Sequence, residues 1–73
     1  METLDLTGLR CPLPLLKLKQ RLHQLPTTAE LLVLTTDSGA LRDFPLFLGQ
    51  AGHQLLRCDT DAAGISCFHI RKG

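Results

Sequence analysis

The fold is decided by residues 3–25, which read TLDLTGLRCPLPLLKLKQRLHQL. In residues 3–7, leucines alternate with polar side chains ahead of Gly8, a pattern that predicts a short strand. In residues 12–25, leucines recur at spacings of three and four between basic and amide side chains, which predicts an amphipathic helix. Pro26 ends this helix, because the residue before a proline disfavours helical backbone. The leucines expected to face the core are Leu15, Leu16, Leu18, Leu22 and Leu25.

The next segments continue the alternation of strand and helix. Residues 30–36, ELLVLTT, are mostly apolar and rich in β-branched side chains, as expected of a strand inside a sheet. The first two strands, with a helix between them, are therefore expected to be parallel and joined by a right-handed crossover. A second helix is predicted to start with Asp43 as its N-cap and Pro45 in its first turn, and to end at Gly52.

Two further strands are predicted at residues 54–59 and 64–72, joined by a turn at residues 60–63. The order β-α-β-α-β-β predicts a two-layer α/β sandwich of the α+β class, with two helices on one face of a four-stranded mixed sheet. The other face of the sheet is expected to be open. The most amphipathic register of the last hairpin turns Leu56, Cys58, Phe68 and Ile70 toward the helices and leaves His53, Arg57, Cys67 and His69 on the open side.

Length and composition restrict the class of protein. With 73 residues and 8.0 kDa, the chain is expected to form one domain, residues 1–73. Hydrophobic residues make up 44% and charged residues 21%, as in ordinary globular proteins, and the apolar runs fall well short of the roughly 20 residues of a membrane span. A net charge of +1 and an aromatic content of 4%, without Trp or Tyr, give neither a strong positive field nor stacking platforms. We therefore expect no membrane association and no direct nucleic-acid partner.

The cysteine count and the first residues predict a cellular compartment. Three cysteines are an odd number, which argues against a disulfide scaffold and for at least one free thiol. Residues 1–5, METLD, lack the basic and apolar regions of a secretory signal. Both features predict a cytoplasmic protein.

Cys11 occupies the junction between the first predicted strand and the first predicted helix. Because Pro12 suits the first helical position, Cys11 is predicted to be the N-cap, with its sulfur over the positive end of the helix. That position and the adjacent Arg10 favour the thiolate over the thiol. Pro14 also lacks an amide hydrogen, so the two prolines form a rigid turn that fixes the position of the thiol but offers it few donors. The alternative interpretation is that Cys11 is only a small apolar side chain in a tight junction.

The basic residues near Cys11 admit two interpretations. Lys17, Lys19 and Arg21, with Arg10 nearby, are predicted to form a basic helix face beside Cys11. Such a face is either a docking surface for an acidic partner or merely solvated surface.

The other two cysteines carry weaker signals. Cys58 is interpreted as a buried, inert thiol. Cys67 and His69 share one strand face, which suits a thiol with its base or part of a metal site, but the segment lacks the paired short spacings of a structural zinc site, so we expect no metal. The scattered glycines form no phosphate loop, and no catalytic triad can be assigned from spacing.

Residues 4–14, LDLTGLRCPLP, resemble the TusA/SirA-type sulfur carrier family, whose mark is a Cys-Pro-x-Pro motif after a short Leu-Asp-x-x-Gly strand. The similarity extends over essentially the whole chain and implies a fold similar to the carboxy-terminal domain of bacterial translation initiation factor three. It also implies that Cys11 accepts a sulfane sulfur as a persulfide. Within the motif, Pro12 and Pro14 would form the turn of this cysteine, and Arg10 and Lys19 would support it electrostatically.

The resemblance implies partners rather than a cofactor. A cysteine desulfurase or rhodanese-like protein would donate the sulfur, and a downstream sulfurtransferase would accept it, in tRNA thiolation or in sulfur trafficking. Family members carry no pyridoxal phosphate themselves, so no cofactor is expected. We expect a monomer that forms transient complexes.

Two other functions remain open at this point. The first is a non-catalytic regulatory or interaction module that binds partners through the basic helix face or the open sheet face. The second is a redox sensor that uses Cys11 with Cys58 or Cys67.

Overall fold

The first half of the chain forms a parallel β-α-β unit. The structure is a computed structural model that describes residues 1–73. Strands β1 (Glu2–Asp5) and β2 (Glu30–Thr35) pair in parallel, and helix α1 (Leu13–Gln24) connects them, as predicted. β1 ends at Asp5, before the predicted limit, because the chain turns at Gly8, where φ is 82° and glycine is favoured.

Helix α2 (Ala40–Ala51) begins earlier than predicted. Its N-cap is Gly39, so the prediction of Asp43 as N-cap with Pro45 in the first turn is wrong, and Pro45 lies inside the helix. The earlier start is possible because the amides of the first turn bond to carbonyls of the preceding loop, which closes a turn ahead of the proline. The end is as predicted: Gly52 adopts a left-handed conformation with φ of 82°.

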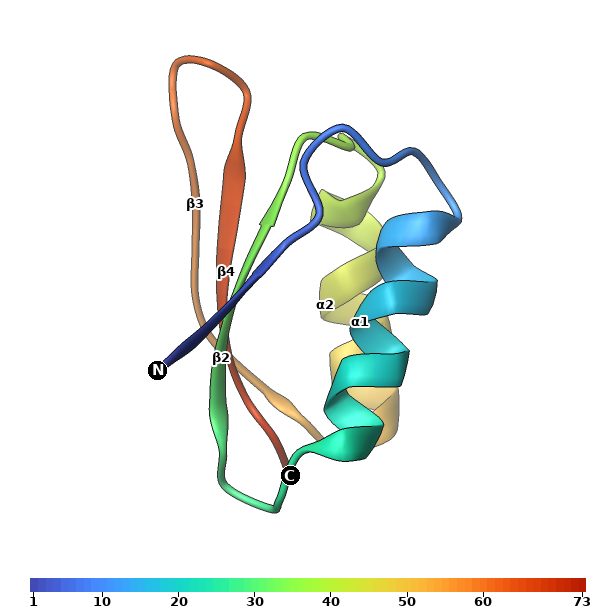
Figure 1. Ribbon diagram of the computed structural model, residues 1–73, viewed down its shortest axis with the longest axis vertical. Helices are drawn as coiled ribbons and strands as arrows, with labels where there is room; N and C mark the ends of the chain where they lie inside the picture. The colour runs from blue at the N-terminus through green and yellow to red at the C-terminus, as the bar shows by residue number, and fades with distance from the viewer.

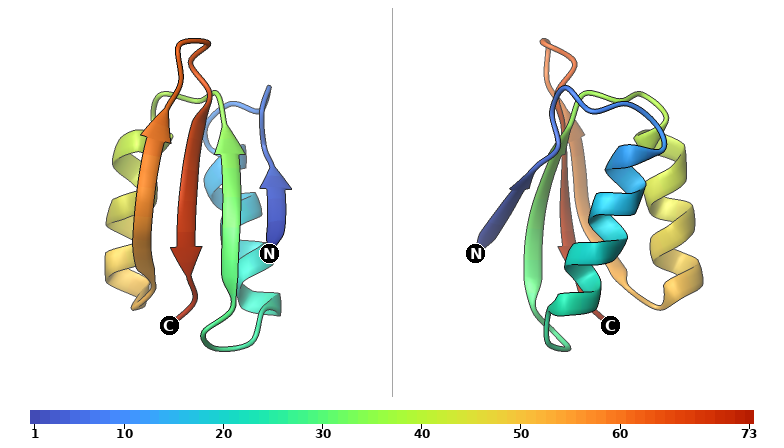
Figure 2. Two further views of the ribbon diagram at one scale, coloured as in Figure 1. Left: turned by 90° about the vertical axis from the view of Figure 1, so that its left-hand side faces the viewer. Right: turned by 45° about the vertical axis from the view of Figure 1, so that its right-hand side comes forward.

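The sheet has the strand order β1-β2-β4-β3 and is mixed. β3 (Gln54–Thr60) and β4 (Ser66–Arg71) form the predicted antiparallel hairpin, and β4 also pairs antiparallel with β2. Both helices lie on one face of this sheet, and the other face is open (Figures 1 and 2). The predicted two-layer architecture is confirmed.

One hydrophobic core lies between the sheet and the helices. At its centre the rings of Phe44 and Phe68 are 4.8 Å apart between centroids, a favourable tilted arrangement. Of the leucines predicted to face the core from α1, Leu16 does not, because its side chain is 47% exposed. Neither helix is long and apolar enough to cross a membrane. The core consists of Leu6, Leu18, Leu22, Leu31, Val33, Ala40, Phe44, Leu48, Phe68 and Ile70.

The predicted register is correct for β4 and partly wrong for β3. Phe68 and Ile70 are buried toward the helices. β3 contains a bulge between Leu55 and Arg57, so Leu55 rather than Leu56 lies opposite Ile70 and packs against the core. The extra residue, Leu56, is 46% exposed.

Beyond the bulge, from Arg57 onward, β3 follows the predicted register. Cys58 lies opposite Phe68 and therefore on the helix side, whereas Arg57 lies opposite His69 on the open side. Cys67 also belongs to the open side. His53 was predicted there too, but it precedes β3 and lies against Phe47 of α2, with ring centroids 6.0 Å apart.

Candidate functional site

Cys11 lies in the loop between β1 and α1, at the end of the molecule where the β2–α2 loop and the β3–β4 hairpin also lie (Figure 1). Its side chain is exposed. The N-cap of α1 is Pro12, so the prediction that Cys11 caps the helix is wrong by one residue, and the Cys11–Pro12 peptide is cis. The thiol therefore projects from the loop just ahead of the helix.

A hydrogen-bonded turn holds the start of this loop against β2. The Asp5 carboxylate accepts from the backbone N–H of Thr7 at 2.9 Å and from its hydroxyl at 2.7 Å. Both hydrogen bonds lower the pKa of Asp5, and the bond from the Thr7 hydroxyl has the larger effect. One residue later, the Gly8 N–H donates to the Thr36 hydroxyl at 3.0 Å. The loop that carries Cys11 is thus anchored to the end of the neighbouring strand.

The two prolines anchor the other side of Cys11. Pro14 is buried in the second position of α1, whereas Pro12 is exposed. The Leu13 N–H, between the two prolines, donates to the Arg10 carbonyl at 2.9 Å and is therefore not free to bond to the thiol. The turn therefore has even fewer free donors than the sequence suggested, and its contribution is to fix the position of the thiol.

Two exposed leucines follow Cys11 on α1 and were missed by the sequence analysis. Leu13 and Leu16 are 45% and 47% exposed and lie three residues apart, hence on one helix face. We call them the Leu13–Leu16 patch. The sequence does indicate that these two leucines are exposed, because they do not fit the helical spacing of the buried residues Leu18 and Leu22. Apolar side chains beside an exposed thiol suit transient contact with another protein.

The predicted basic face of α1 is divided in the structure. Successive residues are rotated by about 100° around the helix axis, so Lys17 and Lys19 are about 200° apart and lie on different sides of the helix. Lys17 is exposed on the side of the Leu13–Leu16 patch, whereas the Lys19 ammonium lies 5.2 Å from the centroid of the Phe47 ring in α2. Arg10 is exposed beside Cys11. Of the predicted cations, Arg10 and Lys17 are therefore the exposed ones that lie nearest to Cys11 along the chain.

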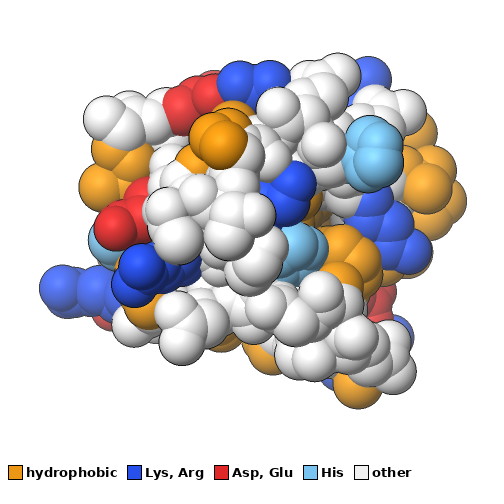
Figure 3. Space-filling view, turned by 90° about the horizontal axis from the view of Figure 1, so that it is seen from below, with side chains coloured by type: hydrophobic (Ala, Val, Ile, Leu, Met, Phe, Trp, Pro, Cys, Tyr) orange, Lys and Arg blue, Asp and Glu red, His pale blue; other side chains and the backbone are white.

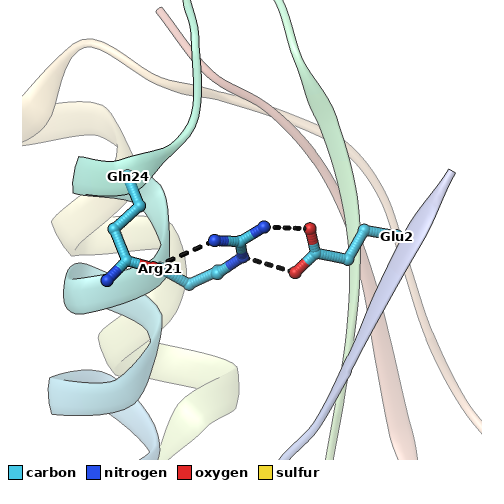
Figure 4. Close-up of polar contacts among 3 residues, drawn as sticks. All are labelled: Glu2, Arg21 and Gln24. Atoms are coloured by element: carbon cyan, nitrogen blue, oxygen red, sulfur yellow. Dashed lines mark hydrogen bonds and ion pairs between the residues drawn. The ribbon is translucent and has the colours of Figure 1, made fainter.

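Arg21 is engaged elsewhere. Figure 4 shows its guanidinium making two bonds to the Glu2 carboxylate of β1 and one to the side-chain oxygen of Gln24. The bond from Arg21 lowers the pKa of Glu2. Arg21 thus joins the edge strand to α1 and does not extend the basic surface near Cys11.

The remaining cysteines lie on the sheet. Cys58 lies opposite the core residue Phe68, and Cys67, the neighbour of Phe68 in β4, belongs to the other face. A disulfide requires Cβ atoms about 3.8 Å apart, so two thiols on opposite faces cannot be bridged without backbone movement. Cys58 is exposed, so the prediction of a buried thiol is wrong: it lies in the strand at the sheet edge, where one side of the residue has no neighbouring strand. Partial burial, and secondarily the charge of Asp59, raise the pKa of the Cys58 thiol.

His69 is not paired with Cys67. Its Nε2 lies 2.6 Å from the Glu30 carboxylate on the neighbouring strand. The structure contains no group of three or more His, Cys, Asp or Glu side chains that could hold a metal ion.

Comparison with known proteins places these features in a family. The family model described as Sulfurtransferase TusA matches residues 2–72. A protein of Neisseria meningitidis serogroup A is 54% identical over 55 residues, which cover 75% of this chain and 74% of the relative. The sulfur carrier protein TusA of Allochromatium vinosum is 40% identical over 71 residues, which cover 97% of this chain and 92% of the relative. The fold matches the crystal structure of a SirA-like protein from Desulfitobacterium hafniense with a TM-score of 0.87, at 23% identity and with 100% and 99% of the two chains covered. With a family match over nearly its whole length, the chain belongs to the TusA sulfurtransferase family.

Proposed function

We propose that this protein is a sulfur carrier that receives a sulfane sulfur as a persulfide on Cys11 and passes it to an acceptor protein. The single observation that carries this proposal is the exposed Cys11 thiol on a turn fixed by Pro12 and Pro14, in the Cys-Pro-x-Pro motif. The relatives named sulfur carriers support the same role.

The transfer is two thiol exchanges that need no added oxidant. In the first, the Cys11 thiolate attacks the outer sulfur of a persulfide on the donor, a new S–S bond forms at Cys11, and the donor cysteine leaves as a thiolate. In the second, an acceptor thiolate attacks the outer sulfur of the Cys11 persulfide, and Cys11 leaves as a thiolate. An exposed sulfur on a fixed turn suits both steps, because it must enter the active site of a different protein each time.

The partners that fit this chemistry are a cysteine desulfurase or rhodanese-like protein as donor and a downstream sulfurtransferase as acceptor. Delivery would serve tRNA thiolation or another route of sulfur trafficking. The Leu13–Leu16 patch would contact both partners, and Arg10 and Lys17 would attract acidic residues around their clefts. Lys19, directed at Phe47, would contribute only through its longer-range field.

A cytoplasmic location fits the proposed role. Three unpaired thiols persist best in a reducing compartment. Fractionation of cells with an antibody to the native protein would test the location.

The experiment that tests the function is sulfur loading followed by intact-mass measurement. The protein is incubated with a cysteine desulfurase and cysteine, and we expect it to gain the mass of one sulfur atom, which a thiol reductant then removes. Cys11→Ser should abolish the gain, whereas the matched variants Cys58→Ser and Cys67→Ser should retain it. Loading of the Cys11→Ser protein would refute the assignment of the site. If the unaltered protein gains no sulfur from a desulfurase and none from a rhodanese, a non-catalytic interaction module would be favoured.

A further inference from the structure

The end of the molecule opposite Cys11 contains a hollow that the sulfur chemistry does not use. Its volume is about 220 Å³, and Figure 3 views this end, where lysine, arginine and histidine side chains lie beside apolar ones. Along α1, Leu13 and His23 are ten residues or roughly 15 Å apart, so the hollow is remote from the Cys11 loop. Its lining is Lys19, Leu22, His23, Phe47, His53 and Lys72.

Two lysines bring fixed positive charge to the hollow. The Lys19 ammonium is held over the Phe47 ring, with 5.2 Å to its centroid, a cation–π contact. The backbone of Lys72 is fixed on both sides, because its N–H donates to Ala29 at 2.8 Å and its carbonyl accepts from Thr28 at 2.9 Å. The Lys72 ammonium donates one hydrogen to the Leu25 carbonyl and retains two for a ligand.

His53 adds a neutral donor. Its Nδ1 accepts the Gly73 N–H at 3.0 Å, so in the neutral ring the hydrogen is on Nε2. Burial, and then the charge of Lys72, lower the pKa of His53, which keeps the ring neutral near pH 7.

No acidic side chain lines the hollow or the shallower depression next to it. That depression shares Lys19 and His23 with the hollow and is otherwise lined by Gln20 and Gln24. The glutamates of the chain are engaged elsewhere, Glu2 with Arg21 and Glu30 with His69. The hollow therefore presents several donors and two positive charges, with no acidic side chain in its lining.

We propose that this hollow binds a phosphoryl group, either of a small organic phosphate or of a nucleic-acid backbone. A phosphoryl group carries several acceptor oxygens and up to two charges, which matches two ammonium groups and an imidazole N–H better than a single carboxylate does. The apolar walls, Leu22 and Phe47, leave room for the organic group attached to the phosphate. This binding site is additional to the carrier function and shares no residue with the Cys11 loop.

The test is a titration of the isotope-labelled full chain followed by amide and imidazole NMR signals. The ligands are inorganic phosphate, adenosine monophosphate and a short single-stranded RNA, with sodium chloride at matched ionic strength as the reference. We expect saturable shifts at His23, Phe47, His53 and Lys72, and none that saturate at Lys17. Tightest binding of adenosine monophosphate would identify the small-phosphate source, and tightest binding of the RNA the backbone source.

The variants separate this site from general charge effects. Lys19→Gln combined with Lys72→Gln should weaken phosphate binding by about tenfold or more, and Lys19→Gln alone should weaken it in part. Lys17→Gln, the same change of charge as Lys19→Gln but on the far side of α1, should leave binding unchanged. Retained helix and sheet signals in the spectra would establish that each variant folds. Non-saturating shifts, equal losses in Lys17→Gln, or tighter binding of a hexaglutamate peptide than of any phosphate would each overturn the proposal.

Discussion

At the scale of single residues, three thiols in one small chain differ in what surrounds them. Cys11 is exposed on a loop anchored by hydrogen bonds of Asp5 and Gly8, so its sulfur is accessible and fixed in place. Cys58 is exposed too, but it lies within a strand, opposite the core residue Phe68 and next to Asp59, and its thiol has a raised pKa. Position in the fold, rather than residue type, therefore separates the thiol that is expected to carry sulfur from the thiol that is not.

The raised pKa of Cys58 predicts a particular pattern of alkylation. In a Cys11→Ser protein at neutral pH, Cys58 should react with iodoacetamide more slowly than a free cysteine peptide, because the thiolate is the nucleophile and burial disfavours it. The rate should rise steeply only at pH values above the ordinary cysteine range. Peptide mapping of the labelled protein over a series of pH values measures this rate, and a profile equal to that of the free peptide would contradict the prediction.

At the scale of elements, the short edge strand β1 depends on its connections to other parts of the fold. It has four residues and one neighbouring strand. The bidentate contact of Arg21 with Glu2 joins it to α1, so this ion pair bridges the two layers of the sandwich (Figure 4).

The ion pair predicts part of the response to acid. The pKa of Glu2 is lower in the folded protein than its ordinary value of 4.5, so its stabilising contribution is present above that value and is lost as the pH falls through the folded pKa. The urea midpoint of the unaltered protein should therefore fall more steeply in acid than that of Arg21→Gln. Lys17→Gln, on the same helix but without an ion pair, is the matched control and should keep the steep fall. Parallel curves for the unaltered and Arg21→Gln proteins would exclude a contribution from the pair.

The order and type of the elements followed from the sequence, but two local details did not. Periodicity identified α1 and the hairpin, because a helix or strand with one buried face shows it in its own residues. The start of α2 was misplaced, because propensity assigns Pro45 to a first turn, whereas the loop carbonyls accept the amides of an extra turn before it. The bulge at Leu56 was missed, because adjacent Leu55 and Leu56 fit either register and only the pairing with β4 decides between them.

At the scale of the whole molecule, the two ends differ in chemistry. One end carries Cys11 with the Leu13–Leu16 patch, and the other carries the basic hollow. The sequence located the first end through the placement of Cys11 between strand and helix. It could not divide the basic residues of α1 between the two ends, because Lys19 is directed by Phe47 and Arg21 by Glu2, partners that only the tertiary fold supplies.

The Leu13–Leu16 patch predicts a defect that is specific to transfer between proteins. Leu16→Ser removes exposed apolar surface and should slow sulfur transfer from a protein donor roughly tenfold, about 1.4 kcal/mol. Loading from inorganic polysulfide needs no docking and should be unchanged. Leu46→Ser alters a leucine that is 59% exposed on α2 and should transfer at the normal rate. Stopped reactions analysed by intact mass give both rates, and equal slowing of both loading routes would indicate damage to the thiol rather than to docking.

The bulge in β3 also bears on how separate copies of the molecule behave when crowded together. β3 is the outermost strand on its side, and an outer strand with a regular row of unpaired backbone groups can recruit a second copy and polymerise. The extra residue Leu56 breaks that row, and the ion pair of Arg57 with Asp59 places charge next to the break. The same bulge that makes the register of β3 hard to predict from the sequence thus leaves this edge a poor template for pairing with a second copy.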